Sequence, residues 1–384
     1  MSIFEGSIKE LQKNNVLVVL SHCGSEWQKA FVAQLAEGLP TVDFADPVVR
    51  DQAVNYTTTF VQALPKPAVL YNLQLAAQLV PILAKGDVPK GSYVAITDQG
   101  YYLAERLDEV QVPWVELPLK LDGARPFVPG GVSKRGKRDV LAAIVQGELF
   151  AQCTQAGADR KQFYASYCKD ILQHKIMEQT TVSDDIKFYR FLGVAASLTG
   201  TVVNYSNLAG GVGITAPTAK QWLQFLAGTG VVYLLQPLEK VGSKRLVKAP
   251  KLYFRDTGMA AQLLQLDDGI SVMKSVYCKN LLENYVVNQI RESYLQQGDV
   301  PQLLFYKDSN YKEISLILCA EGKVYPIAIT KDEVSLRKLY KDFQLLAPFA
   351  EEHGLELTNG CVIGLGKSEG LLENGIVYIP AEKV

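Results

Sequence analysis

Closely spaced metal-binding residues are missing from this 384-residue sequence, which has only six cysteines and three histidines. His22, His174 and His353 lie far apart, and no two cysteines form a CxxC pair. Structural zinc sites draw their ligands from neighbouring Cys and His residues, so no such site is expected here. The scattered cysteines are typical of a reduced, cytoplasmic chain.

The sequence also lacks a charge excess and a long apolar run. Its net charge is −1, so a nucleic-acid or membrane partner would have to be held by a local patch. The apolar run at 16–20 is too short for a signal peptide, and no run approaches the length of a membrane span. With 48% hydrophobic and 21% charged residues, the composition predicts a soluble globular protein of two or three domains.

From the N-terminus to about residue 125, the sequence alternates apolar runs with helical patterns. Strands are expected at 16–20, 41–44, 68–71, 92–96 and 112–117, and helices around 27–37, 56–64, 73–84 and 101–109. This alternation is typical of an α/β domain with a parallel sheet flanked by helices.

The first strand leads into a loop and helix arranged like a phosphate-binding site. The pattern G-x-x-x-x-G-K-[ST] needs glycines so that backbone N–H groups can surround the phosphates, a lysine, and a hydroxyl for magnesium. In the window "CGSEWQKA", Gln28 replaces the second glycine and Ala30 replaces the hydroxyl; only Lys29 matches, with Gly24 available for the turn. The nucleotide site formed by Gly24, Gln28, Lys29 and Ala30 is therefore interpreted as vestigial, and Lys29 as a surface lysine.

A second feature of P-loop ATPases is missing independently. These enzymes need an acid at the end of a neighbouring strand to organise magnesium and water. The corresponding run "PAVLYNLQ" places Tyr71 and Asn72 there, and neither side chain supplies the charge.

The middle of the chain, from about 138 to 270, has the pattern of helices followed by a winged helix. The third helix of the motif is expected to begin near Thr215 and to expose Lys220, Gln221 and Gln224. The wing would present Lys240, Lys244, Arg245 and Lys248, with Lys251 just beyond. A basic wing can contact DNA phosphates, but a winged helix can equally serve as a packing unit between domains. Lys220, Lys240, Lys244, Arg245 and Lys248 are the candidate nucleic-acid-binding residues.

From about residue 275 a helix, three strands, another helix and two further strands indicate a separate α/β unit of about 110 residues. The sequence therefore predicts three domains, at 1–125, 126–270 and 271–384.

Five segments of the chain look like a large prokaryotic family of predicted ATPases. They are "FYASYCKDIL", "FYRFLGVAASLTGTVVNYSNLAGGVGITAPTAKQWLQFL", "GSKRLVKAPKLYFRDTGMAAQLL", "LLENYVVNQI" and "LLFYKDSNYKEISLIL", of which Lys244–Gly258 is the most specific. The resemblance implies an AAA-type P-loop domain, a winged-helix segment, and a C-terminal domain of unknown function similar to restriction endonucleases.

The same resemblance implies active sites that this sequence does not complete. The family's ATPase motifs would require Gly at 28, Thr or Ser at 30, and Asp-Glu at 71–72. In the nuclease-like domain Glu283 matches the helix acid, but the strand acid falls on Ser315, with Glu313 nearby. The remaining acid-x-lysine pattern falls on residues 328–330 ("AIT"), and Lys331 comes one residue late.

The sequence therefore predicts a pseudo-ATPase that acts as a binding or scaffold protein, without ATP hydrolysis or nuclease activity. No catalytic residue, metal or cofactor is assigned, and the protein partner is unknown. Two alternatives stay open: an ATP-binding AAA-type ATPase with an atypical P-loop, which would use ATP and magnesium, or a DNA-associated winged-helix protein. No membrane association is expected.

Overall fold

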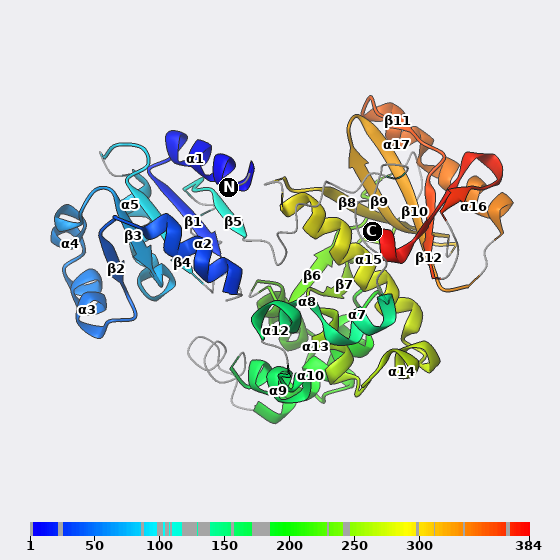
Figure 1. Ribbon diagram of the computed structural model, residues 1–384, viewed down its shortest axis with the longest axis horizontal. Coiled ribbons are helices and arrows are strands. Elements are labelled where there is room, and N and C mark those ends of the chain that lie inside the picture. The colour runs from blue at the N-terminus through cyan, green and yellow to red at the C-terminus, as the bar shows by residue number, and fades with distance from the viewer. Residues whose placement is uncertain are drawn as a thin grey trace. The chain divides into compact units, whose positions relative to one another are not determined.

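The computed structural model describes residues 3–21, 26–85, 88–97, 103, 107, 110–116, 129, 139–154, 157–170, 185–228, 230–240, 246–296, 299–310, 312–332, 335–365 and 369–384. The chain forms two compact units (Figure 1). The first comprises Met1–Gly123 with the short stretches Gly228–Gly230 and Leu295–Asp299, and the second comprises the rest.

A parallel sheet forms the centre of the first unit. Its five strands within the described residues are β1 (Leu17–Ser21), β2 (Thr41–Asp43), β3 (Ala68–Tyr71), β4 (Tyr93–Thr97) and β5 (Trp114–Glu116). They lie in the order β2-β3-β4-β1-β5, and every neighbouring pair is parallel. All five expected strands are present, which confirms the parallel α/β architecture of this region.

Both faces of this sheet are buried, because alternate residues of each strand point to opposite sides. On β1, Val18 and Leu20 pack with side chains of α1 (Ile3–Asn14) and α2 (Glu26–Ala36). Leu17 and Val19 pack on the other face. That face is covered by α3 (Pro47–Asn55), α4 (Thr57–Ala63), η1 (Leu73–Leu79) and α5 (Val80–Lys85). The continuous apolar run in β1 thus reflects a strand buried on both sides.

The sequence pattern misses two helices of the first unit, α1 and α3. The start of α3 nevertheless carries a local signal: the side chain of Asp46 accepts a hydrogen bond from Val48 N at 2.8 Å, and Pro47 occupies the first helical turn. Asp followed by Pro is a favourable helix start.

The middle of the chain is helical with one hairpin. Its elements are α7 (Val140–Gln146), α8 (Glu148–Cys153), α9 (Arg160–Asp170), α10 (Asp185–Ser197), α11 (Tyr205–Gly210), α12 (Ala216–Gly228), β6 (Val232–Leu235), β7 (Lys251–Phe254), α13 (Thr257–Leu263) and α14 (Gly269–Lys274). β6 and β7 pair antiparallel, as expected for a winged helix.

Aromatic packing fixes α12 against α10. Trp222 lies 5.0 Å from Phe188 and 5.4 Å from Phe191 between ring centroids, both in edge-on geometry. Such pairs stabilise a core by about 1 kcal/mol beyond the area that they bury.

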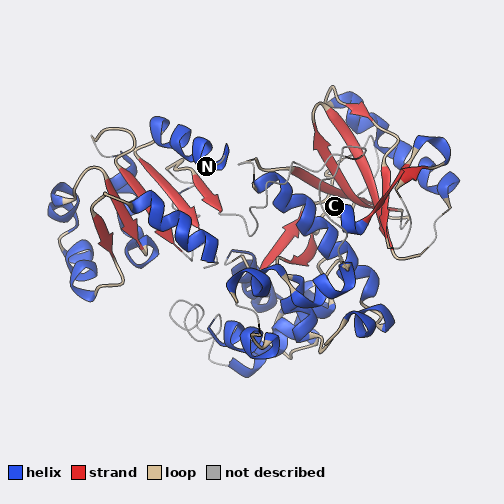
Figure 2. Cartoon of the chain, in the orientation of Figure 1, coloured by secondary structure: helices blue, strands red, loops and turns tan. Residues whose placement is uncertain are grey.

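A long helix and a mixed sheet make up the C-terminal part (Figure 2). Its elements are α15 (Cys278–Leu295), β8 (Gln302–Lys307), β9 (Glu313–Ala320), β10 (Lys323–Thr330), α16 (Leu336–Phe343), η3 (Gln344–Leu346), α17 (Ala347–Glu352), β11 (Glu356–Leu357), β12 (Cys361–Gly364), β13 (Gly370–Leu371), η4 (Glu373–Gly375), β14 (Val377–Pro380) and η5 (Ala381–Lys383). The strand order is β13-β14-β12-β10-β9-β8, with β11 pairing with β10.

Both ends of the wing, the segment between β6 and β7, are hydrogen-bonded to β8. Leu238 N donates to Phe305 O at 2.7 Å, and Val247 N donates to Lys307 O at 3.0 Å. The wing is therefore anchored to the C-terminal sheet at both ends. Among the described residues, no helix combines the length and the apolar character needed to cross a membrane.

Candidate functional site

The vestigial nucleotide site lies partly outside the described residues. Gly24 lies outside the described residues, between β1 and α2 in the chain. Gln28, Lys29 and Ala30 lie in the first turns of α2, where the structure describes the backbone alone. The expected placement of Lys29 at the start of a helix after the first strand is observed.

The carboxyl edge of the sheet can be followed through a chain of polar side chains. Asn72, directly after β3, has a left-handed backbone (φ 57°) and donates to the Asp43 carboxylate at 2.8 Å. Gln74 donates to the Asn72 side chain at 3.4 Å, and Thr97 at the end of β4 donates to Gln74 at 2.7 Å. These groups bond to one another across the ends of β2, β3 and β4.

Tyr71 adds no anionic ligand to this edge. Burial, together with the charge of Asp43, raises the pKa of its hydroxyl above the ordinary value, so it stays protonated at neutral pH. Asp43 itself ends β2, three strands from β1, which is about 14 Å at ordinary strand spacing. Nucleotide-bound magnesium needs a carboxylate next to the phosphates. At the end of β3, where the family resemblance implies Asp-Glu, the described residues therefore offer no carboxylate for that metal.

A second constellation is a buried ion cluster on β7, α15 and β9. The Lys251 ammonium lies 2.7 Å from Glu283 Oε1 and 2.6 Å from Glu313 Oε1. Tyr253, two residues along the same strand, donates to Glu283 Oε1 at 2.7 Å. Lys307 on β8 donates to Glu313 Oε2 at 2.7 Å. The two carboxylates of the nuclease-like domain are thus brought together, and a lysine ammonium lies between them.

Electrostatics keep this cluster ionised. Burial alone would lower the pKa of Lys251, whose side chain is 1% exposed, but the charges and hydrogen bonds of Glu283 and Glu313 outweigh burial and raise it. Burial would raise the pKa of Glu313, yet the neighbouring charges of Lys251 and Lys307 lower it to about 2. Burial and the charge of Glu283 raise the pKa of Tyr253 well above its ordinary value. At neutral pH the ammonium and the Glu313 carboxylate are therefore charged and the phenol is neutral.

The neighbouring positions of the nuclease-like pattern carry no side chains suited to bind a metal. Ser315 on β9 precedes Leu316, which pairs with Ile327 of β10, and the Ser315 hydroxyl accepts from Ile329 N at 3.5 Å. Lys331 follows the end of β10 and pairs with Asp332 at 2.9 Å, so it does not point into the sheet. Within the part of the chain that the structure describes, no group of three or more His, Cys, Asp or Glu side chains could hold a metal ion.

Polar residues of α15 hold β7 through its main chain. Asn284 accepts from Phe254 N at 2.9 Å and donates to Phe254 O at 2.7 Å. Asn288, one turn later, donates to Phe254 O and Arg255 O at 2.8 and 2.9 Å. Glu292, a further turn on, pairs with the Arg255 side chain at 3.4 Å. One stripe of the helix thereby fixes the end of the strand.

The rest of the specific sequence segment, "RDTG", is also structural. Asp256 begins α13 and accepts from Met259 N at 2.8 Å, Leu149 N at 2.8 Å and the Tyr164 hydroxyl at 2.7 Å. A Cβ at Gly258 would clash with the Tyr164 hydroxyl. The segment from Lys251 to Gly258 therefore joins three parts of the second unit and offers no free catalytic group.

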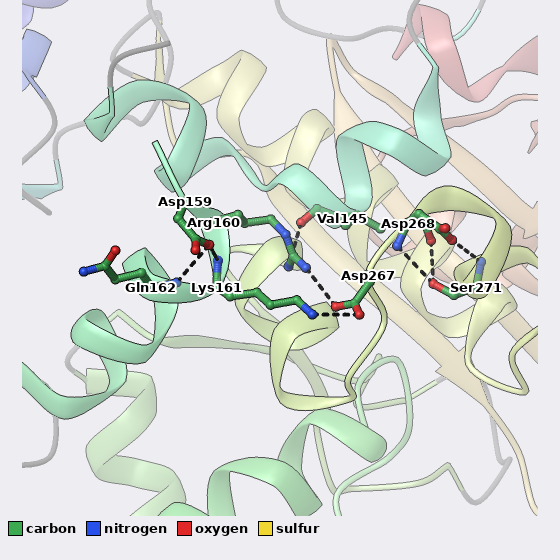
Figure 3. Close-up of polar contacts among 8 residues, drawn as sticks. All are labelled: Val145, Asp159, Arg160, Lys161, Gln162, Asp267, Asp268 and Ser271. Atoms are coloured by element: carbon green, nitrogen blue, oxygen red, sulfur yellow. Dashed lines mark hydrogen bonds and ion pairs between the residues drawn. The ribbon is translucent and has the colours of Figure 1, made fainter. Parts of the chain in front are cut away.

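An exposed ion cluster lies elsewhere in this unit. Figure 3 shows Arg160 and Lys161 of α9 directed at Asp267, at 3.5 and 2.8 Å. The neighbouring Asp268 and Ser271 form a capping box at the start of α14. Exposed pairs of this kind contribute at most about 1 kcal/mol to stability, and they hold a loop rather than a ligand.

The winged-helix residues proposed for nucleic acid fall into three groups. Lys220 on α12 and Lys240 and Lys248 on the wing are exposed. Lys244 and Arg245 lie outside the described residues. Lys251, expected just beyond the wing, is buried in the ion cluster. The helix exposes Gln221 and Gln224 beside Lys220, as predicted.

The cysteines that the structure describes are not nucleophiles. Cys168, which precedes Lys169 in the sequence, is buried, and burial raises its pKa to about 12. Burial also raises the pKa of Cys319 to about 11. Thiols with such pKa values carry almost no thiolate at neutral pH.

Comparisons with known proteins agree with the division of the second unit into a middle and a C-terminal segment. A family model described as a domain of unknown function (DUF8612) matches residues 142–269, and one described as a domain of unknown function (DUF4143) matches residues 278–384. Similar proteins include the uncharacterized Mb2031c of Mycobacterium bovis and Rv2008c of Mycobacterium tuberculosis. Each is 24% identical over 191 residues, which cover 48% of this chain and 40% of the relative. The chain thus matches about two fifths of the length of these curated relatives, whose similarity brings no activity with it.

Proposed function

We propose that the chain is a non-hydrolysing relative of the prokaryotic predicted AAA-type ATPases and acts by binding a partner. The observation that carries this proposal is the carboxyl edge of the N-terminal sheet. Where the ATPase motif requires two acids, Tyr71 remains protonated and Asn72 is bonded to Asp43. No magnesium-organising carboxylate follows β3.

The sheet order supports the AAA-type assignment of the fold. β1 lies between β4 and β5, so the chain crosses from one side of β1 to the other after β4. In open α/β sheets ligands bind beyond the carboxyl ends of the strands at such a switch point. The phosphates of an active relative would lie beyond the end of β1, and Lys29, in the helix that follows, is the one motif residue that this chain keeps.

The ion cluster supports the absence of nuclease activity. Metal-dependent nucleases hold a cation between carboxylates so that it can activate water. Here Glu283 and Glu313 share the Lys251 ammonium at 2.7 and 2.6 Å. A second cation in the same place would meet like charge. The restriction-endonuclease-like assignment thus describes a scaffold whose acids form a structural ion pair.

Phosphate release from ATP with magnesium tests the proposal. The full-length chain and Lys29→Ala should both match the blank without protein. Magnesium-dependent hydrolysis by the wild type that Lys29→Ala abolishes would contradict the proposal. Cleavage of a supercoiled plasmid, assayed with magnesium and with manganese, should likewise equal the blank.

Thermal unfolding with and without ATP separates a pure binding protein from one that retains a nucleotide. At a concentration one hundred times the dissociation constant, a ligand stabilises the folded state by about 2.7 kcal/mol. We expect no shift at millimolar ATP and magnesium. A shift that Lys29→Ala removes would favour nucleotide binding through an atypical loop.

A further inference from the structure

The winged-helix segment has an unusual charge distribution. About one residue in ten of the whole chain is an acid, yet none occurs from Ile186 to Leu238. Between Ile186 and Arg255 there are nine Lys and Arg residues and a single acid, Glu239. The chain as a whole has a net charge of −1. Positive charge is therefore concentrated in this segment.

The structure separates internal from external cations in the segment. Lys251 pairs with Glu283 and Glu313, and Arg255 pairs with Glu292. Arg190 on α10, Lys220 on α12, and Lys240 and Lys248 on the wing are exposed. Because the acids that neutralise the buried cations come from outside the segment, the exposed charge is not balanced within it.

Helix α12 packs its apolar side against α10 and exposes a polar side. Its inward side chains, Trp222 and Phe225 among them, pack against Phe188. Its outward face presents Lys220, Gln221 and Gln224 within about one turn. No large apolar side chain of α12 is exposed. Protein interfaces depend on apolar or aromatic anchors, which this face lacks.

We infer that α12, together with Lys240 and Lys248, forms a docking surface for duplex DNA. This inference rests on the proposed function, because it names the partner of a chain that binds rather than hydrolyses. The major groove of DNA admits an α-helix. Lysines neutralise phosphates, and glutamine side chains can hydrogen-bond both phosphate oxygens and base edges. An acid on α12 would repel the phosphates, and α12 contains none; the wing carries the one exposed acid, Glu239, beside Lys240.

The test is the binding of the full-length chain to a fluorescent duplex of about 25 base pairs, measured by anisotropy at several salt concentrations. The test variant is Lys220→Glu with Lys248→Glu. The matched control is Lys279→Glu with Lys338→Glu, which changes the net charge equally at exposed positions of α15 and α16. Circular dichroism and thermal unfolding confirm that both variants fold.

The wild type should bind with a dissociation constant in the micromolar range or below at low salt, and log affinity should fall as log salt rises. The test variant should bind at least tenfold more weakly, with a salt slope reduced by about 2, because each phosphate contact contributes close to 1. The control should stay within about twofold of the wild type.

Four results would overturn the inference: no binding by the wild type at low salt, equal loss in both variants, equal competition by duplex RNA, or equal competition by polyglutamate of matched charge. The last would indicate an acidic protein as the partner. Equal competition by duplex RNA would also exclude major-groove docking, because a helix cannot enter the narrow groove of A-form RNA. If the chain does not bind DNA, this inference fails, but the proposal that it does not hydrolyse ATP still stands. If the wild type hydrolyses ATP and Lys29→Ala abolishes that activity, the proposed function fails, whatever the DNA-binding result.

Discussion

The side chain of Lys251 lies between two carboxylates, where a metal ion would have to bind. Its ammonium satisfies two carboxylates that a metal would otherwise have to neutralise, and its side chain is 1% exposed. Sequence analysis places it just beyond the wing, after four other basic residues. Its burial was not predictable from the local pattern, since Glu283 and Glu313 are 32 and 62 positions away in the chain. The alternation of Lys251 and Tyr253 on one face of β7 was the available signal.

Replacement of this lysine tests the cluster directly. Lys251→Ala leaves the buried Glu283 carboxylate without its counter-ion, while Glu313 keeps Lys307, and breaking a buried pair in this way costs about 3–5 kcal/mol. We expect that loss in the free energy of unfolding, measured by urea denaturation. Lys338→Ala, at an exposed position, should change it by less than about 0.5 kcal/mol. A loss below 1 kcal/mol in the Lys251 variant would show that the cluster carries little stability.

The lowered pKa of Glu313 makes the stability that the cluster contributes depend on pH. It is lowered to about 2 from an ordinary 4.5, so the folded state binds its proton more weakly than the unfolded state. The resulting stabilisation is fully present above pH 4.5 and declines as pH falls toward 2. The raised pKa of Lys251 acts at the opposite end: its contribution holds below pH 10.5 and is lost as pH rises through the folded value. Unfolding free energies between pH 6 and pH 3 should fall less steeply in Glu313→Gln than in the wild type.

At the scale of elements, strands were easier to predict than helices. Strands β1, β3 and β4 of the first unit are apolar runs buried on both faces, and such runs are visible in the sequence. Helix α1 was missed because only part of one side, including Ile8 and Leu11, packs on the sheet. The contacts of α15 with β7 could not be predicted either, because Asn284 and Asn288 bind main-chain atoms, which carry no sequence signature.

The junction between α7, α9 and α13 depends on glycine. A Cβ at Gly258 would clash with the Tyr164 hydroxyl and lie 2.7 Å from Gln146 O. Gly258→Ala should therefore cost about 1–3 kcal/mol, in the range of overpacked cores. Gly193, within α10, has no atom within 4 Å of an added Cβ. Gly193→Ala is the control and should be neutral or stabilise by up to about 1 kcal/mol. Thermal or urea unfolding distinguishes the two; equal effects would mean that Gly258 is not constrained.

On the scale of the whole molecule, the middle and C-terminal segments should unfold together. β7 is bonded to α15, and both ends of the wing are bonded to β8. Hydrogen exchange should give similar opening free energies for peptides from β6–β7 and from β9–β10, and Lys251→Ala should lower both. Loss of protection in one segment while the other keeps its full protection would show two independent folding units.

The stripe on α15 has a consequence for recombination between relatives. Asn284 and Asn288 form hydrogen bonds with main-chain atoms of the strand. A winged helix from a relative, with different side chains, would therefore still form these hydrogen bonds. The charges behave differently: a transplanted segment without a lysine at position 251 would leave Glu283 of the recipient without its counter-ion, and Glu313 with Lys307 alone. Chimeras should therefore keep both halves from one parent, or exchange the lysine and the two acids as a set.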